Sequence, residues 1–293
     1  MPRRVLFLAA SCFTSTSCRL RVPKFVSIED IHDPRLNHYV NLRQSRSASA
    51  RLADTQAFIA EGSLVVQRLI ESDYEVESVL LKKNREFDWT GLANDTPVYQ
   101  MSADQISRVV GFDFHRGVLA CGRRKPIPTI NRFQLDTTSD AKVTSDLSLG
   151  LFGISEPENM GSMLRTAAAL GINRIVLGPR TIDPFSRRVI RVSMATVFKH
   201  QFYQTQNAVN ELSVLQASGV TTIASTLTPD AAPIKSFGPI KGPALLMIGN
   251  EATGIDPELV AITNHRVRIP MHFGVDSLNA AAAAAILMHQ LTN

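Results

Sequence analysis

The chain has 293 residues, of which 44% are apolar, 19% charged and 6% aromatic, and this suits one large globular domain or two modest ones. It has no apolar run near the roughly 20 residues that a membrane-spanning helix needs, so a membrane protein is not expected. Its three cysteines, Cys12, Cys18 and Cys121, are too few and too scattered for a disulfide framework or a zinc site, and no metal-ligand cluster is visible. A reducing compartment is therefore expected.

The net charge of +5 is concentrated at the start of the chain. Five basic residues precede the first acidic residue, Glu29, whereas the whole chain holds 31 basic and 26 acidic residues, so the remainder is balanced. A nucleic-acid site must therefore come from local clusters of cations and not from the net charge.

Residues 1–24 are rich in Arg, Ser and Thr and contain no acidic residue. This composition resembles an organellar transit peptide and, more loosely, a short secretory signal, and a mis-assigned start is a further alternative. All three alternatives predict a disordered tail or targeting segment outside the fold. We expect a cytoplasmic protein, or a mitochondrial one if residues 1–24 are a transit peptide.

Residues 25–122 alternate helical and strand patterns and predict a small α/β unit. Residues 76–83 and 117–124 are typical of strands, and residues 102–111 predict a capped helix. Residues 123–146 carry prolines and many Ser, Thr and Asp without an apolar period, which predicts a linker with room for one strand.

From Leu147 onward the alternation of strands and helices is stronger. Strands are predicted over residues 147–154, 174–178, 220–226, 243–250 and 265–270, and helices over residues 158–171, 184–194, 207–219, 256–263 and 276–291. Strands separated by helices imply a parallel sheet that helices cover on both faces.

Three loops follow predicted strands, where open α/β sheets bind their ligands. In the first, Asn159 and Gly161 open a helix and Arg165 lies further inside it. Asn159 alone is typical of a helix N-cap. Arg165 interrupts a face of Met, Leu and Ala, where a long cation needs a partner.

In the second loop, a strand of Leu, Met and Ile runs into Gly-Asn-Glu-x-x-Gly. Gly249 and Gly254 allow close backbone approach, and Glu251 is the one acidic residue between them. The structural alternative is a tight turn with Glu at the start of a helix.

In the third loop, Pro270 ends a strand, and Ser277 and Asn279 precede six alanines. Helix capping is the structural alternative for both polar residues. The alanines give the helix a smooth face that can approach another backbone closely.

In this order and spacing, the three loops resemble the motifs of the SpoU/TrmH branch of the SPOUT methyltransferases. That family transfers a methyl group from S-adenosyl-L-methionine to a ribose 2′-hydroxyl of RNA. Its Asn-x-Gly-x-x-x-Arg-Thr-Ala motif matches residues 159–167, and its Gly-x-Glu-x-x-Gly motif matches residues 249–254. Its third motif, Ile-Pro-Met followed by Ser-Leu-Asn and a helix of small residues, matches residues 269–271 and 277–286.

The resemblance implies a C-terminal α/β domain, residues 147–293, with a deep trefoil knot, which is rare among protein folds. The second and third motifs would form the crevice for the cofactor, and the knot helices would form a homodimer interface. Residues 25–122 resemble the family's L30e-like RNA-binding domain through the pattern at residues 57–72, a strand followed by Glu-Gly and then a helix. The run Ala280–Ala285 departs from the Val-Ser-x-Ala-Ala that the family usually shows there.

The resemblance also implies roles for five residues at the site of methyl transfer. Arg165 would act at the 2′-hydroxyl, and because arginine rarely loses its proton we expect it to bind the neighbouring phosphate and stabilise a developing oxyanion. Asn159 would orient Arg165 or the ribose, and Glu251 would fix its loop or pair with Arg165. Ser277 and Asn279 would hold this arrangement.

S-adenosyl-L-methionine is the expected cofactor, and no metal is required. Seven residues from the second and third motifs are expected to bind it, largely through their backbone groups: Met247, Ile248, Gly249, Gly254, Ile269, Met271 and Leu278.

RNA contact requires a local cationic surface. The candidates are Arg187, Arg188 and Arg191 on one predicted helix, with Arg174 and Arg180 just before it, and Arg43, Arg46 and Arg51 in the N-terminal unit. A solvated helix face is the structural alternative for the first group.

The sequence therefore predicts an RNA 2′-O-methyltransferase that acts on ribosomal RNA or tRNA, with ribosomal RNA favoured because of the L30e-like unit; DNA is not an expected partner. A non-catalytic RNA-binding protein that keeps the fold is the alternative. A nucleotide-dependent oxidoreductase is disfavoured, because no early Gly-x-Gly-x-x-Gly turn follows the first strand of either unit.

Overall fold

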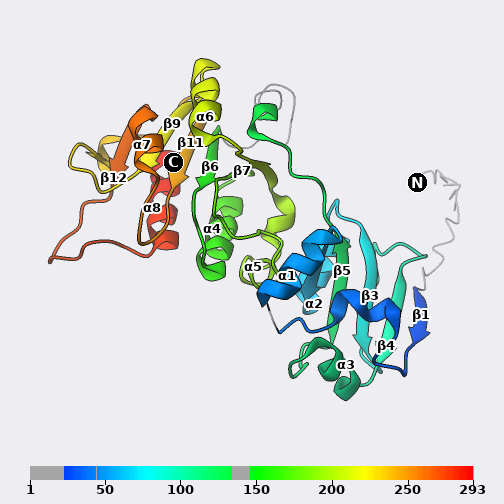
Figure 1. Ribbon diagram of the computed structural model, residues 1–293. Helices are drawn as coiled ribbons and strands as arrows, with labels where there is room; N and C mark the ends of the chain where they lie inside the picture. Colours follow the sequence, from blue (N-terminus) through cyan, green and yellow to red (C-terminus); the bar gives the residue numbers. More distant parts are fainter. Residues whose placement is uncertain (1–22, 44, 134–145, 293) are drawn as a thin grey trace, which may run out of the picture.

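The computed structural model describes residues 23–43, 45–133 and 146–292, and its strands form two sheets (Figure 1). The predictions about the first 24 residues therefore lie almost wholly outside the described residues. The first strand already begins at Lys24. Within the described part of the chain, no helix is long and apolar enough to cross a membrane.

The N-terminal sheet has five strands in the order β1-β4-β3-β5-β2. Its strands are β1 (Lys24–Ser27), β2 (Ala57–Glu61), β3 (Val76–Lys82), β4 (Pro97–Met101) and β5 (Val118–Arg123). Strand β5 is antiparallel to both neighbours, whereas β1, β4 and β3 are parallel. This mixed sheet matches the predicted α/β unit, while its likeness to L30e stays a prediction.

Four helices accompany this sheet: η1 (Pro34–Tyr39), α1 (Ser45–Asp54), α2 (Ser63–Ile70) and α3 (Ala103–Val110). The predicted capped helix is confirmed in α3. Ser102 and Gln105 form a reciprocal capping box at its start, and Gly111 ends it at φ 78°.

The C-terminal sheet has seven strands in the order β10-β12-β9-β11-β6-β7-β8, and every pairing is parallel, as predicted. The strands are β6 (Leu147–Leu151), β7 (Arg174–Leu177), β8 (Gln201–Gln204), β9 (Thr221–Ser225), β10 (Ala232–Pro233), β11 (Ala244–Ile248) and β12 (His265–Arg268). The trefoil knot stays a prediction from the resemblance.

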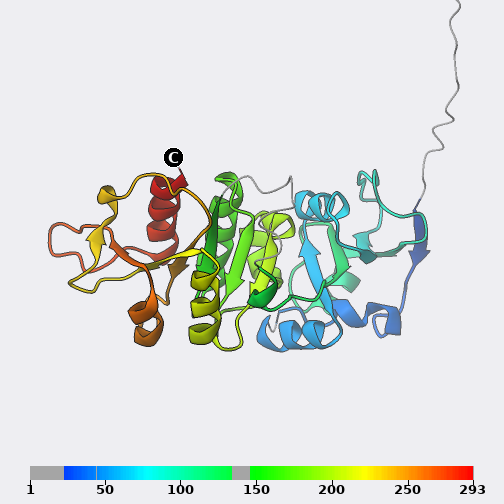
Figure 2. The ribbon, with the colours of Figure 1, turned by 90° about the horizontal axis from the view of Figure 1, so that it is seen from above.

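The helices of this half are α4 (Pro157–Ala169), α5 (Arg187–Val192), α6 (Ala208–Ala217), α7 (Pro257–Ile262) and α8 (Ala280–Thr292), with 3-10 turns η2 (Ile130–Arg132), η4 (Thr196–Lys199) and η5 (Ile234–Ser236). They cover both faces of the sheet (Figure 2). Alternation along β11 sets the two faces: Leu246 and Ile248 belong to the core beneath α4, α5 and α8, and Leu245 and Met247 to the core beneath α6 and α7.

One hydrophobic cluster spans both sheets. The ring of Phe58 on β2 lies 5.4 Å from that of Phe185 and 5.3 Å from that of Phe198, both in the C-terminal half. The guanidinium of Arg124 donates to both carboxylate oxygens of Asp183, at 2.9 and 2.7 Å. The two halves, which lie end to end in Figure 2, therefore share a core and a bidentate ion pair.

Candidate active site

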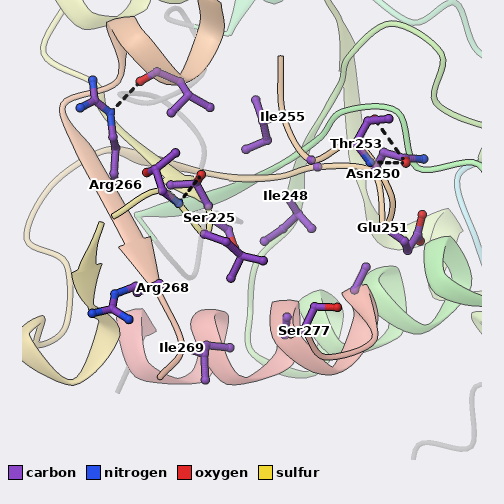
Figure 3. Close-up of a pocket in the computed structure, with 18 of the residues that line it drawn as sticks. Ser225, Ile248, Asn250, Glu251, Thr253, Ile255, Arg266, Arg268, Ile269 and Ser277 are labelled. Atoms are coloured by element: carbon purple, nitrogen blue, oxygen red, sulfur yellow. Dashed lines mark hydrogen bonds between the residues drawn. The ribbon is translucent and has the colours of Figure 1, made fainter. Parts of the chain in front are cut away.

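A cavity of about 680 Å³ lies beyond the carboxyl ends of the parallel strands, where an α/β sheet is expected to bind ligands. Its walls come from the segments after β9, β11 and β12 and from the start of α8. Figure 3 shows Ile248 and Ile255 on one side of the cavity and Ile269 and Ser277 along α8. The second and third motifs identified in the sequence thus meet at one edge of the sheet.

The loop after β11 depends on a glycine for its shape. A Cβ atom on Gly249 would lie 2.3 Å from the backbone carbon of Gly254, so no larger residue fits without moving the backbone. The N–H of Asn250 donates to the carbonyl of Gly254 at 3.1 Å, and the N–H of Gly254 donates back at 2.9 Å. The motif Gly-x-Glu-x-x-Gly therefore closes a tight loop whose ends touch.

Asn250 is the residue that sequence reasoning missed in this loop. Its side-chain oxygen accepts the N–H groups of Ala252 and Thr253, at 2.9 and 3.1 Å. Its amide nitrogen donates to the carbonyl of Gly153 after β6, at 2.9 Å. Asn250 thereby ties the loop to the neighbouring strand, and an Asn directly after a buried strand was the available signal.

Three of the predicted catalytic side chains form one hydrogen-bonded chain. The amide nitrogen of Asn279 donates to the side-chain oxygen of Asn159 at 2.9 Å. The amide nitrogen of Asn159 in turn donates to Oε1 of Glu251 at 2.5 Å. Because Asn159 is only 8% exposed, this chain is shielded from water at its centre.

The capping alternatives have different outcomes. Asn159 is not an N-cap, because Glu156 occupies that position and Asn159 is the third residue of α4. Asn279 caps α8: its side-chain oxygen accepts the N–H groups of Ala281 and Ala282 at 3.0 and 3.3 Å. Ser277 lies outside the helix in an exposed segment that lines the cavity, so it is not the cap.

The helix prediction for residues 276–291 was therefore wrong at its start, since α8 begins at Ala280. Residues 276–279 instead follow an exposed segment that projects from the fold (Figure 1). In the alanine run, Ala280 and Ala284 are buried, and α8 contacts α4. The small side chains permit that close contact.

Arg165 lies on α4 with its side chain exposed to solvent. Within the described residues it forms no ion pair or hydrogen bond with its own chain, and the RNA phosphate expected as its partner stays a prediction. The expected pairing with Glu251 is also not formed, since the hydrogen bond to that carboxylate comes from Asn159. An exposed position explains how α4 carries a long cation among its apolar residues.

Six of the seven expected cofactor-binding residues line the cavity: Ile248, Gly249, Gly254, Ile269, Met271 and Leu278. Met247 does not. Its side chain is fully buried in the core beneath α6 and α7, because it is on the opposite face of β11 from Ile248. Strand alternation sets the direction of this side chain, which the uniformly apolar run of β11 does not reveal in the sequence, and cofactor contact through the backbone of Met247 stays a prediction.

Sequence reasoning also missed the wall formed by Ser225–Thr228 at the carboxyl end of β9. Arg266 and Arg268 of β12 line the same side (Figure 3). The guanidinium of Arg266 donates to Asp230 at 2.5 Å, and that of Arg268 donates to the carbonyl of Ala231 at 3.0 Å. The signal for Ser225–Thr228 was its position after a strand of the same parallel sheet.

The arginines predicted to contact RNA have varied environments. Arg187 is engaged within the protein: its guanidinium forms an ion pair with the buried carboxylate of Glu61 and lies 4.6 Å from the ring of Phe112. It therefore connects the two halves, which corrects its assignment as a free RNA contact. Arg188 pairs with Glu158 on the surface at 2.5 Å.

Arg191 is half-buried and lines a cavity of about 470 Å³ between the halves. The prediction of RNA contact is also corrected for Arg174, which is buried in β7 with its guanidinium 5.2 Å from the ring of Phe133. Arg43 is exposed, whereas the side chain of Arg46 lies outside the described residues. RNA contact through Arg43, Arg188 and Arg191 stays a prediction.

Comparisons with known proteins identify the family of this chain. The model of the SpoU rRNA Methylase family matches residues 146–289. An uncharacterized tRNA/rRNA methyltransferase of Mycobacterium bovis is 32% identical over 92% of this chain and 93% of its own length. The 23S rRNA (guanosine(2553)-2′-O)-methyltransferase RlmP of Bacillus subtilis is 27% identical over 81% of this chain and 89% of its own length.

The fold is also that of solved methyltransferases. An AdoMet-bound rRNA methyltransferase from Sinorhizobium meliloti has a TM-score of 0.74 at 22% identity, covering 91% of this chain and 97% of the other. The SpoU methyltransferase AviRb from Streptomyces viridochromogenes has a TM-score of 0.72 at 20% identity, covering 87% of this chain and 95% of the other. With relatives matched over nearly its whole length and all three motifs at one sheet edge, the chain belongs to the SpoU rRNA methylase family.

Proposed function

We propose that this protein transfers a methyl group from S-adenosyl-L-methionine to a ribose 2′-hydroxyl of ribosomal RNA. Family membership makes the chain an adenosylmethionine-dependent RNA methyltransferase. Its relatives include proteins named as 23S rRNA 2′-O-methyltransferases, in Bacillus subtilis and in Acinetobacter baylyi. The observation that carries the proposal is the chain Asn279–Asn159–Glu251 at the cavity edge, which joins all three motifs.

The cavity fits the cofactor in size and chemistry. Its volume lies within the range of small-molecule sites, and its walls combine apolar side chains such as Ile248 and Leu278 with polar ones such as Thr226 and Glu251. A Cβ on Gly249 would clash with the backbone of Gly254, so the glycine is required for the loop shape that forms this wall of the cavity. Bound S-adenosyl-L-methionine would supply the electrophilic methyl group.

The protein's own contribution is to position and to stabilise charge. Methyl transfer requires the attacking oxygen about 3 Å from the methyl carbon and in line with the departing sulfur. Asn159 uses its oxygen on Asn279 and its nitrogen on Glu251, so its role is to lock the loop and the start of α8 together. The cation of Arg165 would bind a backbone phosphate and stabilise negative charge on the attacking oxygen.

The active protein would be a homodimer. Arg165 is not among the residues that line the cavity of its own chain, and the segment before α8 exposes large apolar residues. Leu278 is 38% exposed and Ile286 on α8 is 43% exposed, so a second copy packed on α8 would cover both. Light scattering after gel filtration should give twice the chain mass, and a monomer that retains full transfer activity would contradict this part.

The proposal is tested by transfer of labelled methyl from S-adenosyl-L-methionine to ribosomal RNA, with the modified ribose mapped in RNA from cells with and without the gene. Arg165→Ala should lower kcat by about 100-fold or more, because a cation facing the reacting oxygen is lost. Its cofactor Kd should stay within about threefold, since Arg165 lies outside the cavity.

Arg108→Ala is the matched control, because Arg108 is an exposed helical arginine on α3 of the N-terminal half. It should leave both quantities unchanged. A large loss of cofactor affinity in Arg165→Ala would mean that Arg165 belongs to the cofactor site. No measurable binding of S-adenosyl-L-methionine to the wild-type chain would overturn the proposal and favour a non-catalytic RNA-binding protein.

A further inference from the structure

Three metal-ligating side chains meet in the N-terminal half, far from the methyl-transfer site. His38 belongs to η1, Glu77 to β3 and Cys121 to β5. Cys121 Sγ lies 3.2 Å from His38 Nδ1 and 3.4 Å from Glu77 Oε2, and these nitrogen and oxygen atoms lie 3.7 Å apart. Within the described ranges, no other group of three or more His, Cys, Asp and Glu donors is close enough to share a metal ion.

The fold creates this cluster. Strands β3 and β5 are neighbours, and Ser78 pairs with Cys121 in their register. The pairing is irregular between Val76 and Ser78, so Glu77 sits at a bulge, where a strand can redirect a side chain. The hydroxyl of Tyr39, next to His38, shares a 2.8 Å hydrogen bond with Ser78 and so holds η1 over the strands.

The spacing of the donor atoms matches tetrahedral coordination. Zinc bonds of about 2.3 Å to sulfur and about 2.1 Å to nitrogen or oxygen, at tetrahedral angles, place the donors roughly 3.4–3.6 Å apart. The three observed separations, 3.2, 3.4 and 3.7 Å, lie within about 0.2 Å of this range. We propose that His38, Glu77 and Cys121 bind one divalent transition-metal ion of the zinc class.

The surroundings of the cluster suit such an ion. Arg123 Nη2 donates to Glu77 Oε1 at 2.7 Å, which orients the carboxylate and leaves Oε2 directed at the cluster. Cys121 is buried, whereas the side chains of His38 and Glu77 are 34% and 18% exposed. One side therefore faces solvent, which provides an entry path and lets water serve as the fourth ligand.

Coordination requires the thiolate form of Cys121. Burial and the neighbouring Glu77 raise the pKa of the free thiol, which in this structure hydrogen bonds to Glu77. On binding, the metal–sulfur bond replaces the sulfur–hydrogen bond, and the proton leaves to solvent. The ion would join η1 to two strands of the sheet, so its role would be structural and independent of the proposed methyl transfer.

Cobalt(II) titration of the full chain under reducing conditions tests the site, because cobalt bound to a thiolate gives a charge-transfer absorption band. We expect the band to saturate at about one equivalent. Cys121→Ser should abolish it, and His38→Gln should weaken binding at least about tenfold. His32→Gln, an exposed histidine of the same segment, and the double variant Cys12→Ser, Cys18→Ser should both leave it unchanged.

A second measurement does not depend on the buried cysteine variant folding well. Zinc should raise the Tm of the wild-type chain and of His32→Gln, but not that of His38→Gln, and a chelator should reverse the shift. No cobalt band, a band that persists in Cys121→Ser, or a zinc shift that survives His38→Gln would overturn the proposal. The three side chains would then be joined by hydrogen bonds alone.

Discussion

The two sheets of this protein place their polar side chains differently. In the parallel C-terminal sheet, the functional side chains follow the strands, in loops and at helix starts such as those that carry Glu251 and Asn159. In the mixed N-terminal sheet, two of the three proposed metal ligands, Glu77 and Cys121, lie within the strands. A loop site leaves a contiguous motif in the sequence, whereas a site within strands consists of single residues that only the strand register brings together.

Glycines provide the sharpest contrast between the two sheets. Gly249→Ala puts a Cβ against the backbone of Gly254, which cannot yield without displacing the loop. A displacement near 1 Å in a site costs about 100-fold in rate, so methyl transfer should fall by about that factor and the Kd for S-adenosyl-L-methionine should rise in calorimetric titration. Gly238→Ala, with open space around its Cβ, is the control and should bind normally.

In the N-terminal sheet the counterpart is Gly122→Ala, whose Cβ would lie 2.4 Å from the ring of Phe58. That crowding should lower the free energy of unfolding by about 1–3 kcal/mol and leave the cofactor Kd of the folded chain unaltered. If Gly249→Ala instead bound cofactor normally while losing stability, the two glycines would have the same structural role.

Arg187→Ala tests whether this arginine acts between the halves or on RNA. It should lower the free energy of unfolding in urea by about 2–3 kcal/mol, because Glu61, 5% exposed, keeps only Arg116 at 3.3 Å. Arg191→Ala, from the same helix, should change stability by less than about 0.5 kcal/mol and weaken RNA binding with a smaller salt dependence. Unchanged stability with weakened RNA binding in Arg187→Ala would restore its assignment as an RNA contact.

The smallest expected effect concerns the start of α8. Asn279→Ala should lower the free energy of unfolding by about 1 kcal/mol, because two N–H groups lose their cap. It should also lower kcat, since Asn159 and Glu251 lose their anchor. Ser277→Ala should leave stability as it is, and equal destabilisation by both changes would show that Ser277 contributes to the cap.

Buried strands and capped helices leave local patterns in a sequence. These patterns made it possible to predict the parallel sheet, most of its strands and helices along the chain, and the three loop motifs. Short edge strands such as β8 and β10 were not, since they owe their form to pairing with β7 and β12. The direction of Met247 was also hidden, because a strand buried on both faces shows no alternation.

The site was predictable as a set of residues but not as a geometry. The hydrogen bond from Asn159 to Glu251 joins residues 92 positions apart, and nothing in either motif shows that Glu251 would meet an asparagine instead of Arg165. The ion pair of Arg187 with Glu61 spans 126 positions and depends on how the two halves pack. Contacts of this range follow from tertiary structure alone.

The aromatic cluster shared by the two sheets has a thermodynamic consequence. If either half unfolded by itself, the faces of Phe58, Phe185 and Phe198 that now cover one another would be exposed to water. Exposing this apolar surface on the half that stayed folded would raise its free energy, so partly unfolded states are disfavoured. We therefore expect the two halves to unfold together, so that a substitution in either half lowers the stability of both.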